Sequence, residues 1–171
     1  GTALQSSRDR QPDPHTDQTS AALDMVQTYL VADARGDLST LVNLMFDGSV
    51  ELRGGREAAI EQLKNQRRFR TRYTMPPRLI EIGKATLVTY ENAKVAIVPL
   101  RVTRQGFPEH QASYRKYSAV SFDDGLSWQI ITPDCVNRGL VTPEVDMFVA
   151  AYVKAKFQAI GGDYDLVLRD P

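Results

Sequence analysis

The feature that most constrains the fold is a change in hydrophobic period in the middle of the chain. Before Pro76-Pro77, apolar residues recur every three or four positions, as they do on amphipathic helices. After these prolines, apolar and polar residues alternate, as they do along half-buried strands. Helices followed by a run of antiparallel strands are typical of the α+β class, in which helices cover one face of a single sheet. The chain is therefore predicted to be α+β.

The first half is predicted to hold three helices, over residues 17–34, 38–45 and 56–68. Gly36 ends the first helix, because glycine tolerates the positive φ of a helix end. Asp37 caps the second helix, since its short side chain accepts hydrogen bonds from the free amides of the first turn. A short strand is predicted over residues 49–53, where apolar and polar residues alternate before the break at Gly54-Gly55.

The second half is predicted to hold four β-rich segments, over residues 79–90, 94–104, 112–122 and 126–132. Pro99 lacks the N–H that a strand ladder needs, so an edge or a bulge is expected there. Asp123-Asp124-Gly125 is the turn of a hairpin between the last two of these segments. A final helix is predicted near residues 142–160, followed by a short strand over residues 164–168.

Composition excludes several kinds of protein. The 171 residues carry 21 Lys and Arg against 21 Asp and Glu, so the zero net charge creates no overall field that attracts nucleic acid or an anionic membrane. No apolar run approaches the roughly 18 residues of a transmembrane helix. One cysteine and two distant histidines exclude an intrachain disulfide and disfavour a metal site. Neither a cofactor nor a nucleic-acid partner is expected.

The length of the chain indicates one domain, because domains average about 150 residues. Residues 1–17 are polar and contain prolines, so they are predicted to form a flexible tail ahead of a single domain over residues 18–171. A chain that begins at Gly1 with such a tail fits the removal of a signal peptide, which slightly favours export over a cytoplasmic location.

Three segments of the first half resemble NTF2-like proteins: Val26–Leu38, Leu44–Asp47 and Val50–Ala58. This family includes the steroid delta-isomerases, polyketide cyclases of the SnoaL kind and many uncharacterised proteins, and the resemblance covers residues 18–135. It implies an NTF2-like, or cystatin-like, cone in which helices and a curved antiparallel sheet enclose an inner pocket. The C-terminal helix is an extra element beyond that cone. A homodimer is also implied, because the open sheet face of this fold commonly pairs two copies.

The resemblance also carries over individual residues. In the steroid isomerase branch, a tyrosine of the first helix donates a hydrogen bond to the developing enolate, and Tyr29 matches that position. A catalytic aspartate follows a Val-Glu pair on the first strand of that branch, whereas Leu52 follows Val50-Glu51 here. Glu51 does not replace it, because neighbouring strand residues point to opposite sides. The general base of the isomerase is therefore missing, and no catalytic residue is predicted.

Five side chains are predicted to bind a ligand: Tyr29, Arg101, Tyr114, Trp128 and Asp134. Tyr29 is either a hydrogen-bond donor in the pocket or a core tyrosine of an amphipathic helix. Trp128 either stacks on a ligand or packs in the core. Asp134 lies at the end of the hairpin strand, near the expected floor of the pocket. Arg101 binds a carboxylate if it is buried. If it lies on the outer face, it is an exposed charge that keeps the strand soluble.

Alternation along the strand predicted over residues 112–122 separates two candidate faces. One face carries Tyr114, Lys116 and Ser118, and the other carries Arg115 and Tyr117. One set lines the pocket, and the other meets solvent or a partner. The pattern alone leaves open which set is which.

Two further motifs favour ordinary structural roles. Residues 121–128 match the pattern S-x-D-x-G-x-[ST]-W, an Asp box that forms a structural turn on the propeller blades of sialidases, and the single copy here is predicted to be a hairpin turn. Residues 53–72 carry seven Lys or Arg against two Glu, an excess of five positive charges. This basic run is either a solvated helix end, where cations suit the helix dipole, or a site for an anionic small ligand or partner protein.

Three functions remain open from the sequence. The first is a binding module that holds a small, mostly apolar molecule in the pocket beside Tyr29. The second is an isomerase, dehydratase or cyclase, which needs an Asp, Glu or His within hydrogen-bond reach of Tyr29. The third is a structural or dimerisation domain whose pocket is filled by its own side chains. The groups that line the pocket distinguish these functions.

Overall fold

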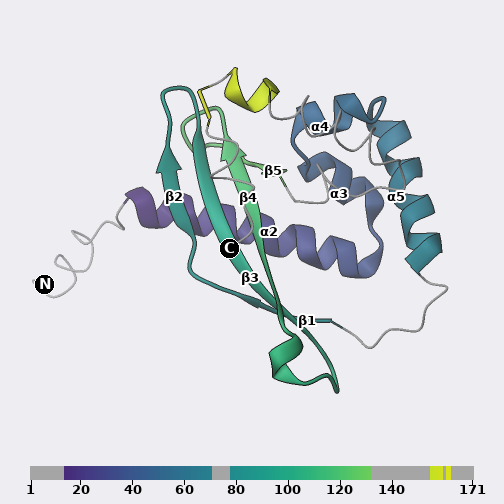
Figure 1. Cartoon of the computed structure of the whole chain (residues 1–171). Coiled ribbons are helices and arrows are strands. Elements are labelled where there is room, and N and C mark those ends of the chain that lie inside the picture. Colours follow the sequence, from purple (N-terminus) through teal and green to yellow (C-terminus); the bar gives the residue numbers. More distant parts are fainter. Residues whose placement is uncertain (1–13, 71–77, 132–154, 160, 163–171) are drawn as a thin grey trace, which may run out of the picture.

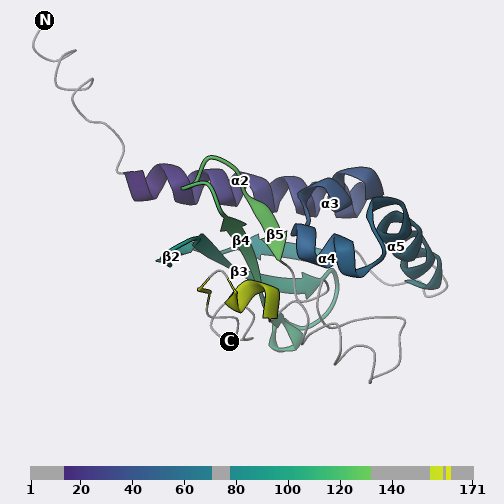
Figure 2. The ribbon, with the colours of Figure 1, turned by 90° about the horizontal axis from the view of Figure 1, so that it is seen from above.

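The computed structural model describes residues 14–70, 78–131, 155–159 and 161–162. Within these residues, helices pack against one face of an open antiparallel sheet of five strands (Figure 1), which confirms the predicted α+β class. Seen from above, the long first helix crosses one face of the sheet, and the turn at 155–159 lies on the other face (Figure 2). Residues 155–158 are helical, whereas the rest of the helix predicted near 142–160 and the strand predicted at 164–168 lie outside the described residues.

The described residues of the first half form four helices: α2 (Pro14–Arg35), α3 (Leu38–Leu44), α4 (Asp47–Leu52) and α5 (Arg56–Arg70). Helix α2 begins at Pro14, three residues before the predicted start, and proline suits a first helical turn because no intrahelical bond needs its N–H. Most of the predicted tail, residues 1–13, lies outside the described residues. Gly36 has a φ of 72°, which confirms the predicted end of α2. The Thr40 N–H donates to Asp37 Oδ1 at 3.2 Å, which confirms Asp37 as the cap of α3.

Helix α4 occupies the position of the strand predicted over residues 49–53, so that prediction is wrong. The Phe46 N–H donates to Ile130 O at 2.9 Å, and the extended stretch ends there. The Ser49 N–H then donates back to Phe46 O at 2.9 Å and starts the helix. Alternation over five residues does not distinguish a short helix from a strand, because the two periods diverge only over longer runs. The Leu52 position carried over from the steroid isomerases therefore lies on a helix.

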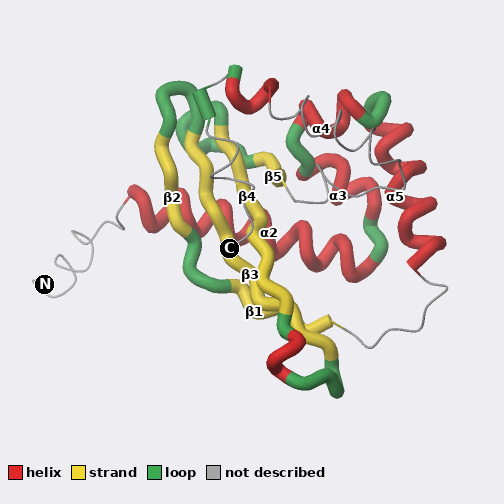
Figure 3. The backbone as a smooth tube through the Cα atoms, viewed as in Figure 1, coloured by secondary structure: helices red, strands yellow, loops and turns green. Residues whose placement is uncertain are grey.

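Five strands follow: β1 (Arg78–Ile82), β2 (Thr86–Thr89), β3 (Lys94–Arg104), β4 (Ser113–Ser121) and β5 (Gln129–Ile131). Their order across the sheet is β1-β3-β4-β5, and β2 also pairs with β3 (Figure 3). Strand β1 pairs with the C-terminal half of β3 and β2 with its N-terminal half, so β1 and β2 together form one interrupted edge. The segment predicted over residues 79–90 is thus two strands, while the strand predicted over residues 94–104 is confirmed.

The interruption between β1 and β2 lies opposite Pro99 of β3. The Gly83 N–H donates to Pro99 O at 2.8 Å, so the backbone polar groups of Pro99 point toward this edge. The missing proline N–H therefore falls where the edge strand is interrupted, and the pairing of β3 with β4 is unaffected. The predicted edge or bulge at Pro99 is therefore wrong, because β3 pairs on both sides without a register break and the neighbouring strands are interrupted instead.

Gly83→Ala is expected to lower the free energy of unfolding by about 1–3 kcal/mol, measured by urea denaturation. A Cβ at position 83 would lie 2.9 Å from Pro99 Cγ, closer than carbon atoms approach without displacement. The loss should shrink when Gly83→Ala is introduced into a Pro99→Ala background, because that Cγ is then absent. An equal loss in both backgrounds would contradict this contact as the cause.

The helices cover one face of the sheet and bury it. Ala96, Val98 and Leu100 alternate along β3 on this face, and all three are buried. Tyr117 of β4 is the register partner of Val98 and packs against Tyr29 of α2. The core therefore lies between β3, β4 and the helices.

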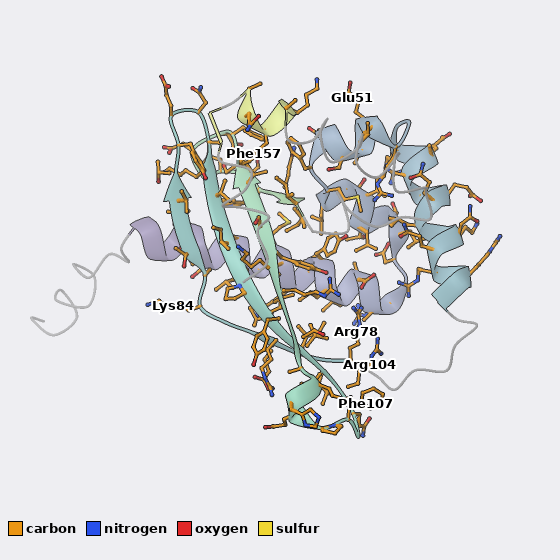
Figure 4. All side chains as sticks on the ribbon, in the orientation of Figure 1. Glu51, Arg78, Lys84, Arg104, Phe107 and Phe157 are labelled. Atoms are coloured by element: carbon orange, nitrogen blue, oxygen red, sulfur yellow. The ribbon has the colours of Figure 1, made fainter. Side chains whose placement is uncertain are left out.

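The outer face of the sheet is covered at one end and exposed at the other. Val95 and Val120 are register partners at the covered end, and both are fully buried. Phe157, labelled in Figure 4, is also buried and packs edge-on against Tyr90 with ring centroids 6.2 Å apart. Tyr114 lies toward the other end and is 61% exposed.

Candidate functional site

The described residues surround a cavity between the helices and the sheet, which we call the helix–sheet cavity. It lies between α2, α3, α5 and β4, and its volume is about 30 Å³. Its apolar lining consists of Leu38, Leu41, Met45 and Leu63. Its polar lining consists of Tyr29, Asp33, Arg53, Gln66, Arg67 and Tyr117.

An aromatic pair forms one wall of the cavity. Tyr29 and Tyr117 are both more than nine-tenths buried, and their ring centroids lie 5.8 Å apart with the ring planes at 79°. This edge-to-face geometry places the positive edge of one ring near the negative face of the other. Of the two strand faces that the sequence leaves open, the face with Tyr117 is thus the one that lines the cavity.

Asp33 joins three elements beside the cavity. Its Oδ1 lies 3.4 Å from Arg67 Nη1 of α5, and its Oδ2 lies 3.1 Å from Arg78 Nη2 of β1. Arg67 Nη1 also donates to Asp33 O at 2.6 Å, so this cation satisfies a carbonyl in the last turn of α2. Both carboxylate oxygens are engaged by guanidinium groups, which makes Asp33 an anchor of α2, α5 and β1.

Arg53 is held at the cavity wall by reciprocal hydrogen bonds. Its Nη1 donates to Gln62 Oε1 at 3.1 Å, and Gln62 Nε2 donates to Arg53 O at 3.2 Å. These bonds join the end of α4 to α5. Gln66 lies one turn after Gln62 on α5 and lines the same cavity.

Arg101 and Tyr114 lie on the outer face of the sheet, away from the cavity. They are partners in the register of β3 and β4. Arg101 Nη1 lies 3.2 Å from Glu81 Oε1, and its Nη2 lies 4.0 Å from Glu109 Oε1. A hydrogen bond with Tyr114, followed by the charges of these two carboxylates, raises the pKa of Arg101. The structure therefore separates both candidates from Tyr29.

Trp128 is buried, but it is not among the residues that line the cavity. Its indole Nε1 has no hydrogen-bond partner in the described part of the chain. Asp134 lies outside the described residues. Of the four candidates that the structure does describe, Tyr29 alone lines the helix–sheet cavity.

No sequence pattern singles out the residues that surround Tyr29. Asp33 carries a local signal, because residues four apart share one side of a helix and Asp33 follows Tyr29 by four. Arg53 and Arg67 belong to the basic run, but no pattern within that run marks which cations turn toward the cavity. Tyr117 belongs to one of the two strand faces that alternation leaves equivalent.

Known proteins give no further guide to this site. No family model, curated protein or solved structure matches the chain significantly. The chemistry of the site is therefore deduced from its own residues. Across residues 14–70, 78–131, 155–159 and 161–162, no three His, Cys, Asp or Glu side chains group to hold a metal ion, and no helix is both long and apolar enough to cross a membrane.

The Asp box at residues 121–128 closes the hairpin between β4 and β5. Asp123 Oδ1 accepts hydrogen bonds from Ser121 Oγ and the Ser127 N–H, each at 2.8 Å, and Asp123 Oδ2 accepts from Ser127 Oγ at 2.6 Å. The Gly125 N–H donates to Ser121 Oγ at 2.8 Å. All four bonds lie within the turn, which supports a structural role for the motif.

Asp123→Asn is expected to make the melting temperature less sensitive to acid. Hydrogen bonds from Ser127, and then from Ser121, hold the pKa of Asp123 below its usual value of 3.8. A carboxylate with a lowered pKa in the folded state adds stability above the unfolded-state pKa, and this stability is lost as the pH falls through the folded-state pKa. Between about pH 5 and about pH 2.5, Tm should therefore fall less in the variant than in the unmodified chain. Parallel falls would contradict this role for Asp123.

Proposed function

We propose that the chain is an NTF2-like domain that binds the end group of a small molecule in the helix–sheet cavity and catalyses no reaction on it. The resemblance of residues 18–135, together with the packing of helices on one face of an antiparallel sheet, supports the NTF2-like assignment, in which the sheet and helices form a cone around this cavity. The observation that carries the function is the lining, in which four apolar side chains and two tyrosine rings lie beside Asp33, Arg53, Gln66 and Arg67. Small-molecule sites have this composition.

The lining favours binding over catalysis. An isomerase, dehydratase or cyclase that used Tyr29 would need a base within hydrogen-bond reach. Asp33 is the single carboxylate among the described lining residues, and Arg67 and Arg78 engage both of its oxygens.

The size of the cavity limits what enters it. A space of about 30 Å³ holds about two water-sized groups, since one water needs roughly 10–15 Å³. Pockets that enclose a whole drug-sized molecule measure about 300–1,000 Å³. The cavity therefore takes one end of a ligand, and the rest of the ligand lies at its mouth, where Leu38 and Leu63 are half-buried. In the structural alternative, the aromatic pair and the ion pairs of Asp33 fill the cone and no ligand enters.

Native mass spectrometry of two matched tryptophan variants tests the binding function. The unmodified chain is expected to carry a small molecule that is released on unfolding. Leu38→Trp blocks the mouth of the cavity and is expected to abolish that added mass. Val31→Trp places the same side chain on the exposed surface of α2, outside the cavity, and is expected to retain it. If both variants retained the added mass, the molecule would be bound elsewhere. If the unmodified chain carried no added mass, the structural alternative with a filled cone would be favoured.

We also propose that two copies pair through the exposed end of the outer sheet face. Tyr114 and Leu79 are 61% and 53% exposed on this face. Glu81 and Arg101 lie in one row with Tyr114 across β1, β3 and β4, and Leu79 lies two residues before Glu81 on β1. A surface that carries both charges and apolar side chains complements itself about a two-fold axis, because each arginine meets the glutamate of the other copy.

Light scattering across a range of protein concentrations tests the pairing. Tyr114→Arg adds a second positive charge beside Arg101 and is expected to convert the dimer to a monomer. Leu126→Arg introduces the same side chain at the Asp-box turn, where Leu126 is 87% exposed, and is expected to leave the dimer intact. A monomeric unmodified chain, or a Tyr114→Arg variant that remains dimeric, would contradict the proposal.

A further inference from the structure

We infer that a second site, a groove between two hairpin turns at one end of the sheet, binds the ammonium group of a small organic amine. We call it the hairpin groove. The inference goes beyond the proposed function, because this groove shares no lining residue with the helix–sheet cavity. Three features support it: the space between the turns, the charge of the lining and an exposed aromatic ring.

The hairpin groove lies where the turn between β2 and β3 meets the turn between β4 and β5, at the same end of the sheet (Figure 3). The two turns are neighbours because Lys94, which follows the first, and Ser121, which precedes the second, are register partners. Residues 89–94 line the groove from the first turn, and Phe122 and Asp124 line it from the second. Its volume is about 440 Å³, within the range of about 300–1,000 Å³ that is usual for small-molecule sites.

An ion pair fixes the position of the two turns. Lys94 Nζ lies 2.7 Å from Asp124 Oδ1 and donates to Gln18 Oε1 of α2 at 3.1 Å. Gln18 Nε2 in turn donates to Asp124 O at 3.3 Å. The Lys94 side chain is only 19% exposed, whereas that of Asp124 is 85% exposed. The cation of the lining is therefore engaged and mostly covered, which makes it a poor partner for an anionic ligand.

The charge that remains in the lining is negative. Glu91 and Asp124 contribute two carboxylates against the one ammonium group of Lys94, which leaves an excess of one negative charge. Asp124 is paired with Lys94, but no ion pair within the described part of the chain involves Glu91. Lys156 of the turn at 155–159 is not among the lining residues. A cation in the groove is therefore attracted, and an anion is repelled.

The lining favours an organic cation over a metal ion. No three His, Cys, Asp or Glu side chains group to hold a metal ion anywhere in the described residues, so the two carboxylates of the groove do not belong to a metal cage. An ammonium group instead donates up to three hydrogen bonds to separate acceptors. The Glu91 carboxylate, the Asn92 amide oxygen and the Thr89 hydroxyl are such acceptors, and all three side chains are exposed.

Phe122 gives the groove an apolar wall. Its side chain is 41% exposed, whereas phenylalanine is among the residues most often buried. It also packs on the buried ring of Phe46 with centroids 5.9 Å apart, so the ring is held in place. Covering an exposed apolar ring with a hydrocarbon group is favourable in water. The groove therefore suits an amine whose ammonium group meets Glu91 and whose apolar body covers Phe122.

The compounds 2-phenylethylammonium and 2-phenylethanol test the inference, because they share an apolar body and differ in charge. In isothermal titration calorimetry at pH 7, the ammonium compound is expected to bind the unmodified chain about fivefold or more tightly than the alcohol. Glu91→Gln should remove most of this preference and leave alcohol binding unchanged. Glu61→Gln is the matched control, because it removes the same charge from an exposed position of α5 outside the groove.

Two further variants test the apolar wall. Phe122→Ala is expected to weaken both compounds by about threefold or more, because the surface that their apolar body covers is lost. Leu126→Ala shortens a side chain of the same turn that is 87% exposed and lies outside the lining, and it is expected to leave both affinities unchanged.

The outcomes also separate this groove from the helix–sheet cavity. Leu38→Trp, which blocks the cavity, is expected to leave both affinities unchanged, and a loss in this variant would overturn the groove as the site. Equal affinities for the two compounds, or no binding of 2-phenylethylammonium to the unmodified chain, would overturn the inference. Equal losses in Glu91→Gln and Glu61→Gln would also overturn it, because they would show a diffuse attraction to negative charge.

Discussion

Tyr117→Ala is expected to lower the free energy of unfolding by about 3–5 kcal/mol, the usual loss when a large buried aromatic side chain is truncated. The Tyr117 ring is buried between β4 and α2, and it packs edge-to-face on Tyr29 at 5.8 Å. Its removal leaves an unfilled space beside the helix–sheet cavity, because the surrounding helices and sheet relax only partly. Urea denaturation measures the loss.

Tyr114→Ala is the matched control for this prediction. Tyr114 lies on the same strand, three residues before Tyr117, but on the opposite and exposed face. Its truncation is expected to change the free energy of unfolding by about 0.5 kcal/mol or less in dilute solution, where the proposed dimer dissociates. Similar losses in the two variants would contradict the assignment of the Tyr117 face to the cavity.

Asp33→Asn is expected to destabilise the junction of α2, α5 and β1. The free energy of unfolding should fall by about 1–3 kcal/mol, because Arg67 and Arg78 lose their shared carboxylate. This loss is smaller than for a fully buried pair, since both arginine side chains are partly exposed. Urea denaturation measures it.

Asp24→Asn provides the matched control. Asp24 lies on the same helix but is exposed, so its replacement removes the same charge outside the cavity lining. It is expected to leave the free energy of unfolding close to that of the unmodified chain. An Asp33→Asn variant as stable as Asp24→Asn would contradict the anchoring role of Asp33.

Features that depend on one residue's own backbone are predictable from the sequence. Gly36 ends α2 because of its positive φ, and Asp37 caps α3 through its own side chain. Pro99 has no N–H to donate and lies opposite an interruption of the neighbouring strands, although β3 itself is neither an edge strand nor bulged there. The change of hydrophobic period at Pro76-Pro77 likewise predicts the α+β class, since each period reflects how a single element presents one face to the core.

Features that depend on distant partners are not predictable in this way. The helical state of α4 follows the hydrogen bond from Phe46 to Ile130, which are far apart in the chain. Asp33 meets Arg67 and Arg78, which lie 34 and 45 residues away. Alternation along β4 likewise shows that Tyr114 and Tyr117 point to opposite sides, but the packing of α2 decides which of them is buried. The cavity is built from such contacts, so Tyr29 is the one predicted candidate among its described lining residues.

The most direct test of binding in the helix–sheet cavity is a methyl-resolved NMR titration with hexanoate, a small probe with a polar end group and an apolar body. Concentration-dependent shifts are expected in the methyl signals of Leu38, Leu41, Met45 and Leu63, which line the cavity. The signals of Leu79 and Leu126, which are exposed elsewhere on the molecule, should not move. Shifts confined to Leu79 or Leu126, or no shifts at saturating hexanoate, would contradict the claim that this cavity is a binding site.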